Sequence, residues 1–284
     1  MRFTRIEIVD RLREQVDRHR PILGAGAGNG LSAKFIERGG ADFLVVYSSG
    51  RFRMSGHSSL CGLLPLCDAN ATVLEMGERE VLPVARTIPV IAGVNATDPT
   101  RDITRFLRVI ADAGFSGVNN FPTVGLFDGQ IRRALEATGL GFEREIEMLG
   151  IAHQQNMFTL AYVFNPEEAA AMTRVGADVV IAHMGLTVGG SVGMDAAAAL
   201  TLDDACRGVQ EIAEAASAVR DGVLVLCHGG PIAEPADAAY VIEHTNTVGF
   251  VGASSIERLP VEEALTKATR SFKTPDRTTT GHSC

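Results

Sequence analysis

The sequence predicts an α/β protein of the (β/α)8 TIM-barrel class with one additional helix at the N-terminus. Eight short apolar runs alternate with helical patterns along 284 residues, a length typical of one barrel domain. The chain is 46% hydrophobic but only 6% aromatic, as expected for Val- and Ile-rich parallel strands that are buried on both faces. Its 30 glycines cluster after the apolar runs, where tight strand-to-helix loops use them.

Hydrophobic periodicity and cap signals place the elements in order. Apolar side chains at helical spacing over 2–19 predict the extra helix, within residues 1–20. Strands are expected at 21–25, 42–47, 89–94, 117–120, 157–164, 178–183, 223–227 and 248–252. Helices are expected at 31–38, 71–87, 99–113, 142–155, from 165 onward, and at 202–219, 235–244 and 260–272. The pair Asn165-Pro166 is typical of a helix start.

Two long irregular stretches, 48–70 and 121–141, interrupt this alternation. Loops of such length inside a compact domain are usually functional or disordered, and we interpret the first as an ordered cover over a site. We expect residues 1–284 to form one domain that ends in a disordered tail at 274–284. The alternative fold is an open doubly wound sheet, since 24–28 (GAGAG) resembles a dinucleotide-binding turn but lacks GxGxxG spacing.

Composition narrows the classes of partner. The net charge is −8 with a pI near 5.4, which argues against nucleic-acid binding. The five cysteines lack CxxC or zinc-ribbon spacing, no apolar stretch is long enough to span a membrane, and no signal peptide is evident. We therefore expect a reduced, cytoplasmic protein that binds neither nucleic acid nor membrane.

Glycine and serine follow the last two predicted strands, where a barrel commonly holds an anionic group. Backbone N–H groups that glycine exposes, together with a helix N-terminus, can bind phosphate or carboxylate without a basic side chain. A simple strand-to-helix turn would use the same residue types. The predicted anion-binding residues are Gly26, Ser48, Gly229, Gly230, Gly252, Ser254 and Ser255.

His183 and His228 are the foremost catalytic candidates, because each ends an apolar strand and should meet solvent at the barrel mouth. The competing interpretation is that each only caps its strand by bonding to backbone. Asn119 or Asn120 could stabilise a developing enolate, and Glu257 lies beside the serine cluster.

A divalent metal ion is a further hypothesis. His183 and His228 are too few for a closed zinc site, but Asp98 or Glu257 could complete an open one. Glu145 and Glu147 open a predicted helix, and we expect both to face solvent.

Four segments resemble the phosphoenolpyruvate hydrolase-like TIM-barrel family, which also supplies the C-terminal domain of plant antiviral-inhibitor proteins. They are 120–126 (NFPTVGL), 182–187 (AHMGLT), 228–232 (HGGPI) and 252–260 (GASSIERLP). The resemblance implies a TIM barrel, an oligomer and a link to phosphonopyruvate or phosphoenolpyruvate chemistry. Antiviral inhibitors pair this barrel with a nucleotide-binding domain; these 284 residues read as the barrel alone, so the resemblance does not lead us to expect nucleotide binding from them. The paired acids that hold magnesium in the related mutases and lyases are also missing, since neither 46–50 nor 94–98 contains Asp-x-Asp.

Three functional hypotheses follow. The first is a hydrolase or lyase that cleaves a C–C or P–C bond in a small 2-oxo, phosphorylated or phosphono acid. The second is a non-catalytic ligand-binding barrel, and the third is a metal-dependent oxygenase, which needs two histidines and a carboxylate. Because a barrel rich in Ala and Gly with an amphipathic N-terminal helix has apolar surface left to bury, we also expect a homo-oligomer with that helix near an interface.

Overall fold

Eight parallel strands close into a barrel in the computed structural model, which describes residues 3–274. Each strand pairs with its neighbour in the chain, and β1 pairs with β8. The strands are β1 (Ile22–Gly26), β2 (Phe43–Val46), β3 (Val90–Gly93), β4 (Gly117–Asn119), β5 (Phe158–Val163), β6 (Val179–His183), β7 (Leu224–His228) and β8 (Gly249–Gly252). The closed order confirms the predicted TIM barrel and rules out the open doubly wound sheet.

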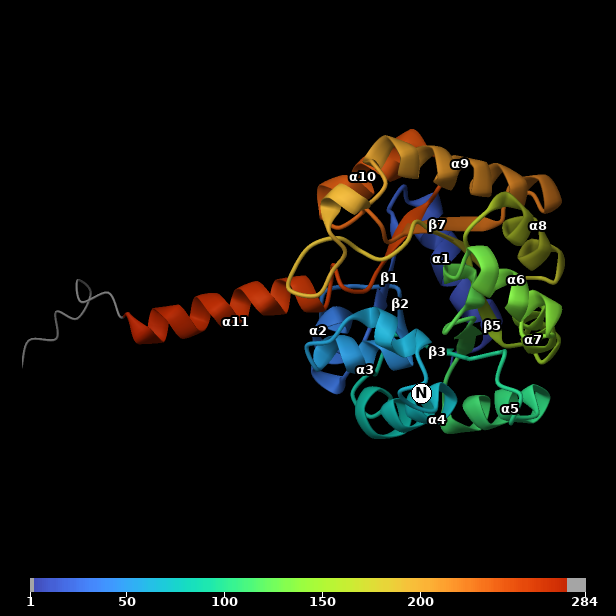
Figure 1. The fold of residues 1–284 in the computed structure, drawn as a ribbon, viewed down its shortest axis with the longest axis horizontal. Coiled ribbons are helices and arrows are strands. Elements are labelled where there is room, and N and C mark those ends of the chain that lie inside the picture. The colour runs from blue at the N-terminus through green and yellow to red at the C-terminus, as the bar shows by residue number, and fades with distance from the viewer. Residues whose placement is uncertain (1–2, 275–284) are drawn as a thin grey trace, which may run out of the picture.

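Helices surround the barrel (Figure 1). They are α1 (Arg5–Asp17), α2 (Gly30–Arg38), α3 (Ser48–Met54), α4 (Ala69–Met76), α5 (Ile103–Ala113), α6 (Gly129–Ala137), α7 (Glu143–Gln154), α8 (Pro166–Arg174), α9 (Leu202–Val219), α10 (Pro235–His244) and α11 (Arg258–Lys273). Side chains of Asn29, Asp68, Asp102, Asn165 and Thr201 cap the helices that follow them by accepting a backbone N–H. Polar residues at these positions thus fix where the chain leaves a loop and enters a helix.

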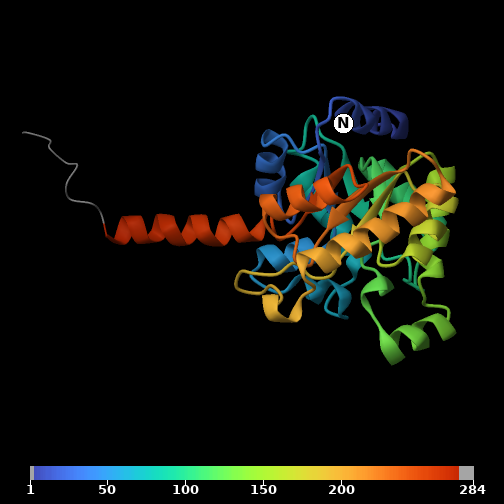
Figure 2. The same cartoon turned by 90° about the horizontal axis from the view of Figure 1, so that it is seen from above.

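The additional helix α1 is present and begins with a Thr4–Glu7 capping box. Its Ile8 and Leu12 are fully buried in the hydrophobic core. Figure 2 shows α1 at one end of the barrel and α6 at the other. The apolar face of α1 therefore already packs on its own barrel, and the opposite end is left to the loops that follow the strands.

Both stretches predicted to be irregular contain helix. Within 48–70 lie α3 and a 3-10 turn, Ser59–Leu63, while α6 lies within 121–141. The sequence pattern does not predict α3, because Gly50 lies within it and Gly56 follows it closely, and glycine lowers helix propensity. Tertiary contacts of the buried Arg53 hold α3 in place instead.

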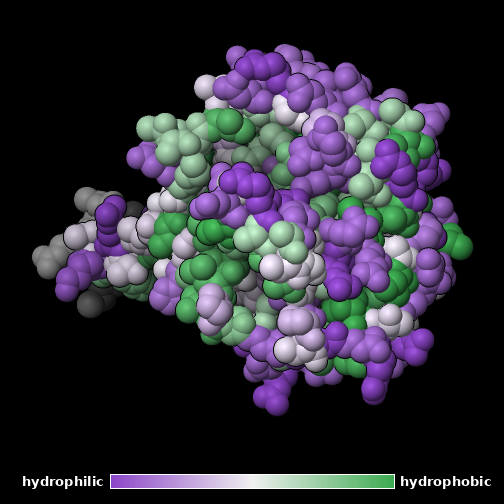
Figure 3. Space-filling view, turned by 45° about the vertical axis from the view of Figure 1, so that its right-hand side comes forward, coloured by the Kyte–Doolittle hydropathy of each residue, from purple (hydrophilic) through white to green (hydrophobic). Residues whose placement is uncertain are grey.

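No helix of the described residues is long and apolar enough to cross a membrane. The face in Figure 3 is a mosaic of hydrophilic and hydrophobic patches. The predicted tail falls almost entirely on residues 275–284, which lie outside the described residues.

Candidate active site at the carboxyl ends of the strands

A small cavity of about 40 Å³ lies where the strands end. Its lining mixes aromatic, imidazole and hydroxyl groups with a few aliphatic side chains: Tyr47, Ser49, Arg53, Ser59, Leu60, Phe121, Leu126, Tyr162, His183, Gly185, Leu186, Thr187, His228, Ala253 and Ser254. A single water needs about 10–15 Å³ on this scale, so the enclosed part of the cavity has the size of a few water molecules, and the cavity is partly open to solvent.

His183 and His228 lie side by side in this cavity. They end β6 and β7 and are direct partners in the strand register. Their ring centroids are 4.5 Å apart with the planes at 75°. Only 7% of His183 and 6% of His228 is exposed, so the expectation that both meet solvent is wrong. The surrounding aromatic side chains cover them.

Each histidine ring makes one hydrogen bond to the backbone. The partner of His228 is an acceptor and the partner of His183 is a donor. Nδ1 of His228 lies 2.6 Å from the carbonyl oxygen of Val251, which can only accept, so this nitrogen carries the proton. Nδ1 of His183 accepts the N–H of Gly185 at 3.0 Å. In the neutral rings, His228 is therefore left with a free acceptor at Nε2, and His183 with a free donor at Nε2. The pair presents one acceptor and one donor.

Burial keeps both rings neutral. It lowers the pKa of His228 to about 4, with the Arg53 charge adding to the effect and the Val251 bond opposing it. Burial, and then the neighbouring His228, lower the pKa of His183 well below its ordinary value. At neutral pH the pair is thus uncharged and can exchange a proton with a bound ligand.

The Tyr162 ring packs against both histidine rings. Its ring stacks on His228 with centroids 5.2 Å apart and meets His183 edge-on at 5.1 Å. The Tyr162 hydroxyl is buried close to the Tyr47 side chain but meets the geometry of a hydrogen bond with no group of residues 3–274. Burial raises the pKa of Tyr162 and of Tyr47, which also lines the cavity, so both hydroxyls keep their protons. An unpartnered buried O–H at the lining of a cavity is available to bind a ligand.

Glu257 is engaged with Arg53 and does not line the cavity. One carboxylate oxygen accepts Nε of Arg53 at 2.8 Å and its terminal nitrogen at 2.5 Å, and the other accepts the N–H of Gly28 at 2.6 Å. Both side chains are at most 1% exposed. Gly26 makes room for this pair, because a Cβ there would lie 2.8 Å from the Tyr47 hydroxyl and 3.2 Å from Arg53. The ion pair anchors α3 to the loop after β8.

Of the two glycines after β7 that were predicted to bind an anion, Gly230 has its N–H engaged within the fold. Gly229 and Gly230 have φ of +76° and +59°, which favours glycine, but the N–H of Gly230 is donated to Gly185 at 2.9 Å. Gly252 lies within β8 against Ile256, outside the cavity lining. These glycines shape the loops around the site.

The serines after β8 keep free donors. No acceptor for the backbone N–H of Ser254 or Ser255 occurs between residues 3 and 274, and Ser254 lines the cavity. The hydroxyls of Ser255 and Ser48 are buried and unpartnered in the same part of the chain. Of the predicted anion-binding residues, Ser254 and Ser255 therefore keep backbone donors without a protein acceptor in this part of the chain.

Asn119 and Asn120 point in opposite directions. The Asn119 amide donates to the Leu160 carbonyl at 3.2 Å, and its oxygen is buried without a partner within the described chain. Asn120 instead clamps the backbone of Tyr162, accepting its N–H at 2.7 Å and donating to its carbonyl at 3.0 Å. Asn120 therefore positions Tyr162, whereas Asn119 has an acceptor to spare.

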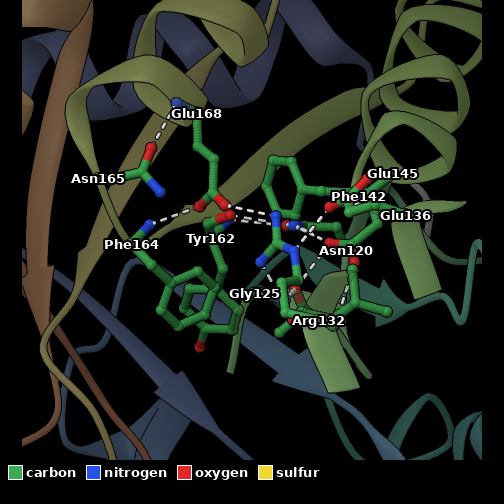
Figure 4. A network of polar contacts seen from close by, with 12 residues as sticks. Asn120, Gly125, Arg132, Glu136, Phe142, Glu145, Tyr162, Phe164, Asn165 and Glu168 are labelled. Carbon is green, nitrogen blue, oxygen red and sulfur yellow. Dashed lines mark hydrogen bonds and ion pairs between the residues drawn. The ribbon is translucent and has the colours of Figure 1, made fainter. Parts of the chain in front are cut away.

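Glu145 holds the loop that closes one side of the cavity (Figure 4). Its carboxylate accepts hydrogen bonds from the Asn120 amide at 2.6 Å, the Thr123 hydroxyl at 2.7 Å and the Val124 N–H at 2.8 Å. Glu145 is fully buried, and burial raises its pKa to about 8. The expectation that it faces solvent is wrong, because the loop that bears Phe121 folds over it. Glu147 does face solvent.

A second charged group supports the same loop. Arg132 donates to Glu168 at 2.9 Å, to Glu136 at 2.6 Å and to the Val124 carbonyl at 3.2 Å. Glu168 in turn accepts the N–H of Phe164 at 2.9 Å. The loop before α6 is thus tied to the loop after β5 (Figure 4).

The described residues do not form a metal site at the cavity. No group of three or more His, Cys, Asp or Glu side chains is gathered for a metal ion among residues 3–274. Asp98 bonds to Arg101, Thr100 and Asn70 outside the cavity lining, and its pKa is lowered to about 2, where burial opposes these hydrogen bonds. Magnesium prefers oxygen ligands, and the lining contains neither Asp nor Glu, so the donor set present does not fit it.

Sequence reasoning missed Tyr47, Tyr162 and Arg53. Strand alternation would have placed Tyr162 inside the barrel, two residues beyond Leu160. The burial of Arg53 follows from its pairing with Glu257, 204 residues away, and no local pattern predicts that.

Comparison with known proteins agrees with the fold. The sequence matches the family described as "Phosphoenolpyruvate hydrolase-like" over residues 7–274. It is 53% identical over 270 residues to "ToMV susceptible protein tm-1(GCR26)" and to "ToMV resistance protein Tm-1(GCR237)", both from Solanum lycopersicum. Each match covers 95% of this chain but only 35% of the tomato protein, so the chain spans about a third of these relatives.

The fold is also that of a solved enzyme. A crystal structure of phosphonopyruvate hydrolase in complex with oxalate and Mg²⁺ superimposes with a TM-score of 0.55 at 18% identity. The match covers 94% of this chain and 87% of that one, and at this identity it establishes a shared fold. From the family match over nearly the whole sequence, the chain belongs to the phosphoenolpyruvate hydrolase-like family.

Proposed function

We propose that this chain is a hydrolase or lyase that cleaves a C–C or P–C bond in a small 2-oxo, phosphorylated or phosphono acid. One observation carries the proposal: a neutral donor and a neutral acceptor, His183 and His228, lie side by side at a small cavity that is partly open to solvent. Family membership and the shared fold with phosphonopyruvate hydrolase support the reaction class.

A phosphono acid illustrates how the pair would act. Nε2 of His228 takes a proton from water as the water oxygen attacks phosphorus. The P–C bond breaks, and its electron pair moves into the C3–C2–O2 unit as an enolate. The N–H at Nε2 of His183 donates a hydrogen bond to that oxygen. His228 then returns the proton to C3, so the products are phosphate and the 2-oxo acid.

The acidic groups of the substrate would bind on the other walls. The free N–H group of Ser254 and the hydroxyls of Tyr47 and Tyr162 lie at the cavity lining and are donors suited to carboxylate or phosphonate oxygens. An anion bound there would raise the low pKa of His228, since a nearby negative charge favours the protonated ring. The ligand itself would thus strengthen the base that acts on it.

A non-catalytic ligand-binding barrel is the second candidate. It is favoured by the absence of any carboxylate in the cavity lining of the described chain and by the names of the tomato relatives, which concern virus susceptibility and resistance. The oxygenase hypothesis needs a carboxylate beside the two histidines, so the lining gives it no support.

Incubation of the purified chain with phosphonopyruvate, phosphoenolpyruvate and oxaloacetate, with and without Mg²⁺, tests the proposal. Phosphorus and proton NMR would follow the products, and the expected result is phosphate with pyruvate, or oxalate with acetate. Oxalate titration by calorimetry runs in parallel, with Tyr162→Phe, which removes a cavity hydroxyl and should weaken binding, compared against Tyr240→Phe on α10, which should not. Oxalate binding without turnover of any of the acids would favour the ligand-binding barrel.

A further inference from the structure

Three leucines line the cavity farther along the chain than the histidines. His183 and His228 are the last residues of their strands and are at most 7% exposed. Leu60, Leu126 and Leu186 belong to the loops that follow β2, β4 and β6. Leu60 is 41% exposed, and the other two are partly exposed. These three side chains, which we call the leucine rim, therefore lie nearer to solvent than the histidines do.

Each loop of the leucine rim is braced by a hydrogen bond close to its leucine. The three bonds run from the Ser49 hydroxyl to the Ser59 carbonyl at 2.6 Å, from the Val124 N–H to Glu145 at 2.8 Å and from the Gly230 N–H to the Gly185 carbonyl at 2.9 Å. Figure 4 shows how Glu145 and Arg132 hold the second of these loops. The rim is thus a preorganised apolar surface, as recognition of one particular ligand shape requires.

The charge of the lining suits a ligand with a single anionic group. Arg53 is the one charged side chain that lines the cavity within the described chain, and Glu257 already balances it. One carboxylate can use the neutral donors of Ser254, Tyr47 and Tyr162. A phosphono acid brings a second anionic group, and placing it against apolar side chains without a partner is unfavourable. The lining therefore favours an acid with one anionic end and one apolar end.

We propose, on the basis of the hydrolase function proposed above, that the substrate is a 2,4-dioxo acid whose apolar chain beyond C4 lies against Leu60, Leu126 and Leu186. Water can hydrolyse a C–C bond by the steps given for a phosphono acid only where the carbon that it attacks is a carbonyl. C4 of a 2,4-dioxo acid is such a carbon, and the C2 carbonyl can hold the released electron pair as an enolate.

The histidine pair supplies each proton that the reaction moves. Nε2 of His228 takes a proton from water as the water oxygen adds to C4, and the C4 oxygen then carries the negative charge. The buried Tyr162 hydroxyl is a donor available to that oxygen. As the C4 carbonyl forms again, the C3–C4 bond breaks and its electron pair moves into the C3–C2–O2 unit, where O2 accepts the N–H of His183. His228 returns the proton to C3, so the products are pyruvate and a carboxylic acid that carries the apolar chain.

Calorimetry with 2-oxo acids of increasing length tests recognition of the chain without any reaction. The probes are pyruvate, 2-oxobutanoate, 2-oxopentanoate and 2-oxohexanoate. Each CH₂ that becomes buried against the leucine rim should tighten binding by about threefold. An affinity that stays flat or falls along the series would overturn the role of the rim.

Turnover tests the substrate class. Butanoylpyruvate should yield butanoate and pyruvate in proton NMR, with a kcat/KM roughly tenfold above that of acetylpyruvate because its chain is two CH₂ groups longer. Cleavage of phosphonopyruvate but of neither dioxo acid would overturn this substrate class and leave the proposed function intact. Cleavage of no acid, with binding that still rises with chain length, would contradict the proposed function and support recognition by the rim.

Leu60→Gln and Leu186→Gln place an amide in the leucine rim. Each should weaken binding of 2-oxohexanoate by at least about fivefold and leave pyruvate binding unchanged, since only the longer acid reaches the rim. Circular dichroism should show an intact fold for Leu60→Gln, because Leu60 is partly exposed. Leu64→Gln is the matched control: Leu64 is 52% exposed, lies four residues beyond Leu60 and does not line the cavity. It should keep the full dependence on chain length.

The two Gln variants decide whether the rim recognises the chain. Equal weakening of pyruvate and 2-oxohexanoate binding, or unchanged binding of both acids in Leu60→Gln and Leu186→Gln, would overturn the proposal.

Discussion

The ring centroids of His183 and His228 lie 4.5 Å apart, and the two rings carry their protons on different nitrogens. Nδ1 of His183 accepts a backbone N–H, whereas Nδ1 of His228 donates to a backbone carbonyl. Among the seven histidines of the chain, these two end neighbouring strands in register. The barrel itself thus presents a hydrogen-bond donor and a hydrogen-bond acceptor from two residues of the same type.

Nitrogen-15 NMR of histidine-labelled protein checks this arrangement. We expect the Nδ1–H form for His228 and the Nε2–H form for His183, with both rings neutral from pH 7 to pH 5. Rings that titrate near pH 6.5, or two identical tautomers, would refute the assignment.

The same burial makes stability depend on pH. The folded pKa of His228, about 4, lies below the ordinary value, so the unfolded chain binds the proton first. The stability that neutral His228 contributes is complete above about pH 6.5 and is lost as the pH falls toward 4. The loss in the free energy of unfolding is on the order of 3 kcal/mol. Denaturant unfolding at several pH values should show this loss, and His228→Asn should reduce it.

Glu145 gives the opposite dependence. Its folded pKa, about 8, lies above the ordinary value, so the unfolded chain releases the proton first. The stabilising contribution is complete below about pH 4.5 and is lost as the pH rises through about 8. Glu145→Gln should flatten this slope and lower stability by about 1–3 kcal/mol, since Gln leaves one donor unpaired. Glu147→Gln, one turn away and exposed, should leave the unfolding curves unchanged at every pH.

We expect the Arg53–Glu257 ion pair to contribute strongly to the free energy of unfolding. Arg53→Met leaves the buried Glu257 carboxylate without its charged partner, and Glu257→Gln does the same to the Arg53 guanidinium. Each substitution should lower the free energy of unfolding by about 3–5 kcal/mol. The exposed Arg18–Glu14 pair is the control, and Arg18→Met should cost less than about 1 kcal/mol. Chemical unfolding measures both, and equal effects would mean that the buried pair does not anchor α3.

The sequence predicts the barrel well because strand burial is a local property of apolar runs. The bounds of α9 and α10 coincide with the predicted 202–219 and 235–244, where cap residues and periodicity agree. The chemistry is less accessible from sequence. Asn119 and Asn120 looked equivalent, yet alternation turns one toward the barrel interior and the other toward Glu145. The pairing of Arg53 with Glu257 joins segments that only the closed barrel brings together.

Turnover by His228→Asn tests the central claim most directly. Asparagine can keep the bond to the Val251 carbonyl but removes the free acceptor at Nε2. On whichever acid the wild type cleaves, this variant should lose at least about a hundredfold in kcat while still binding oxalate. His183→Leu should lose a similar factor through its missing donor, and the exposed His244→Asn should match the wild type. Full activity in both His228→Asn and His183→Leu would contradict the account.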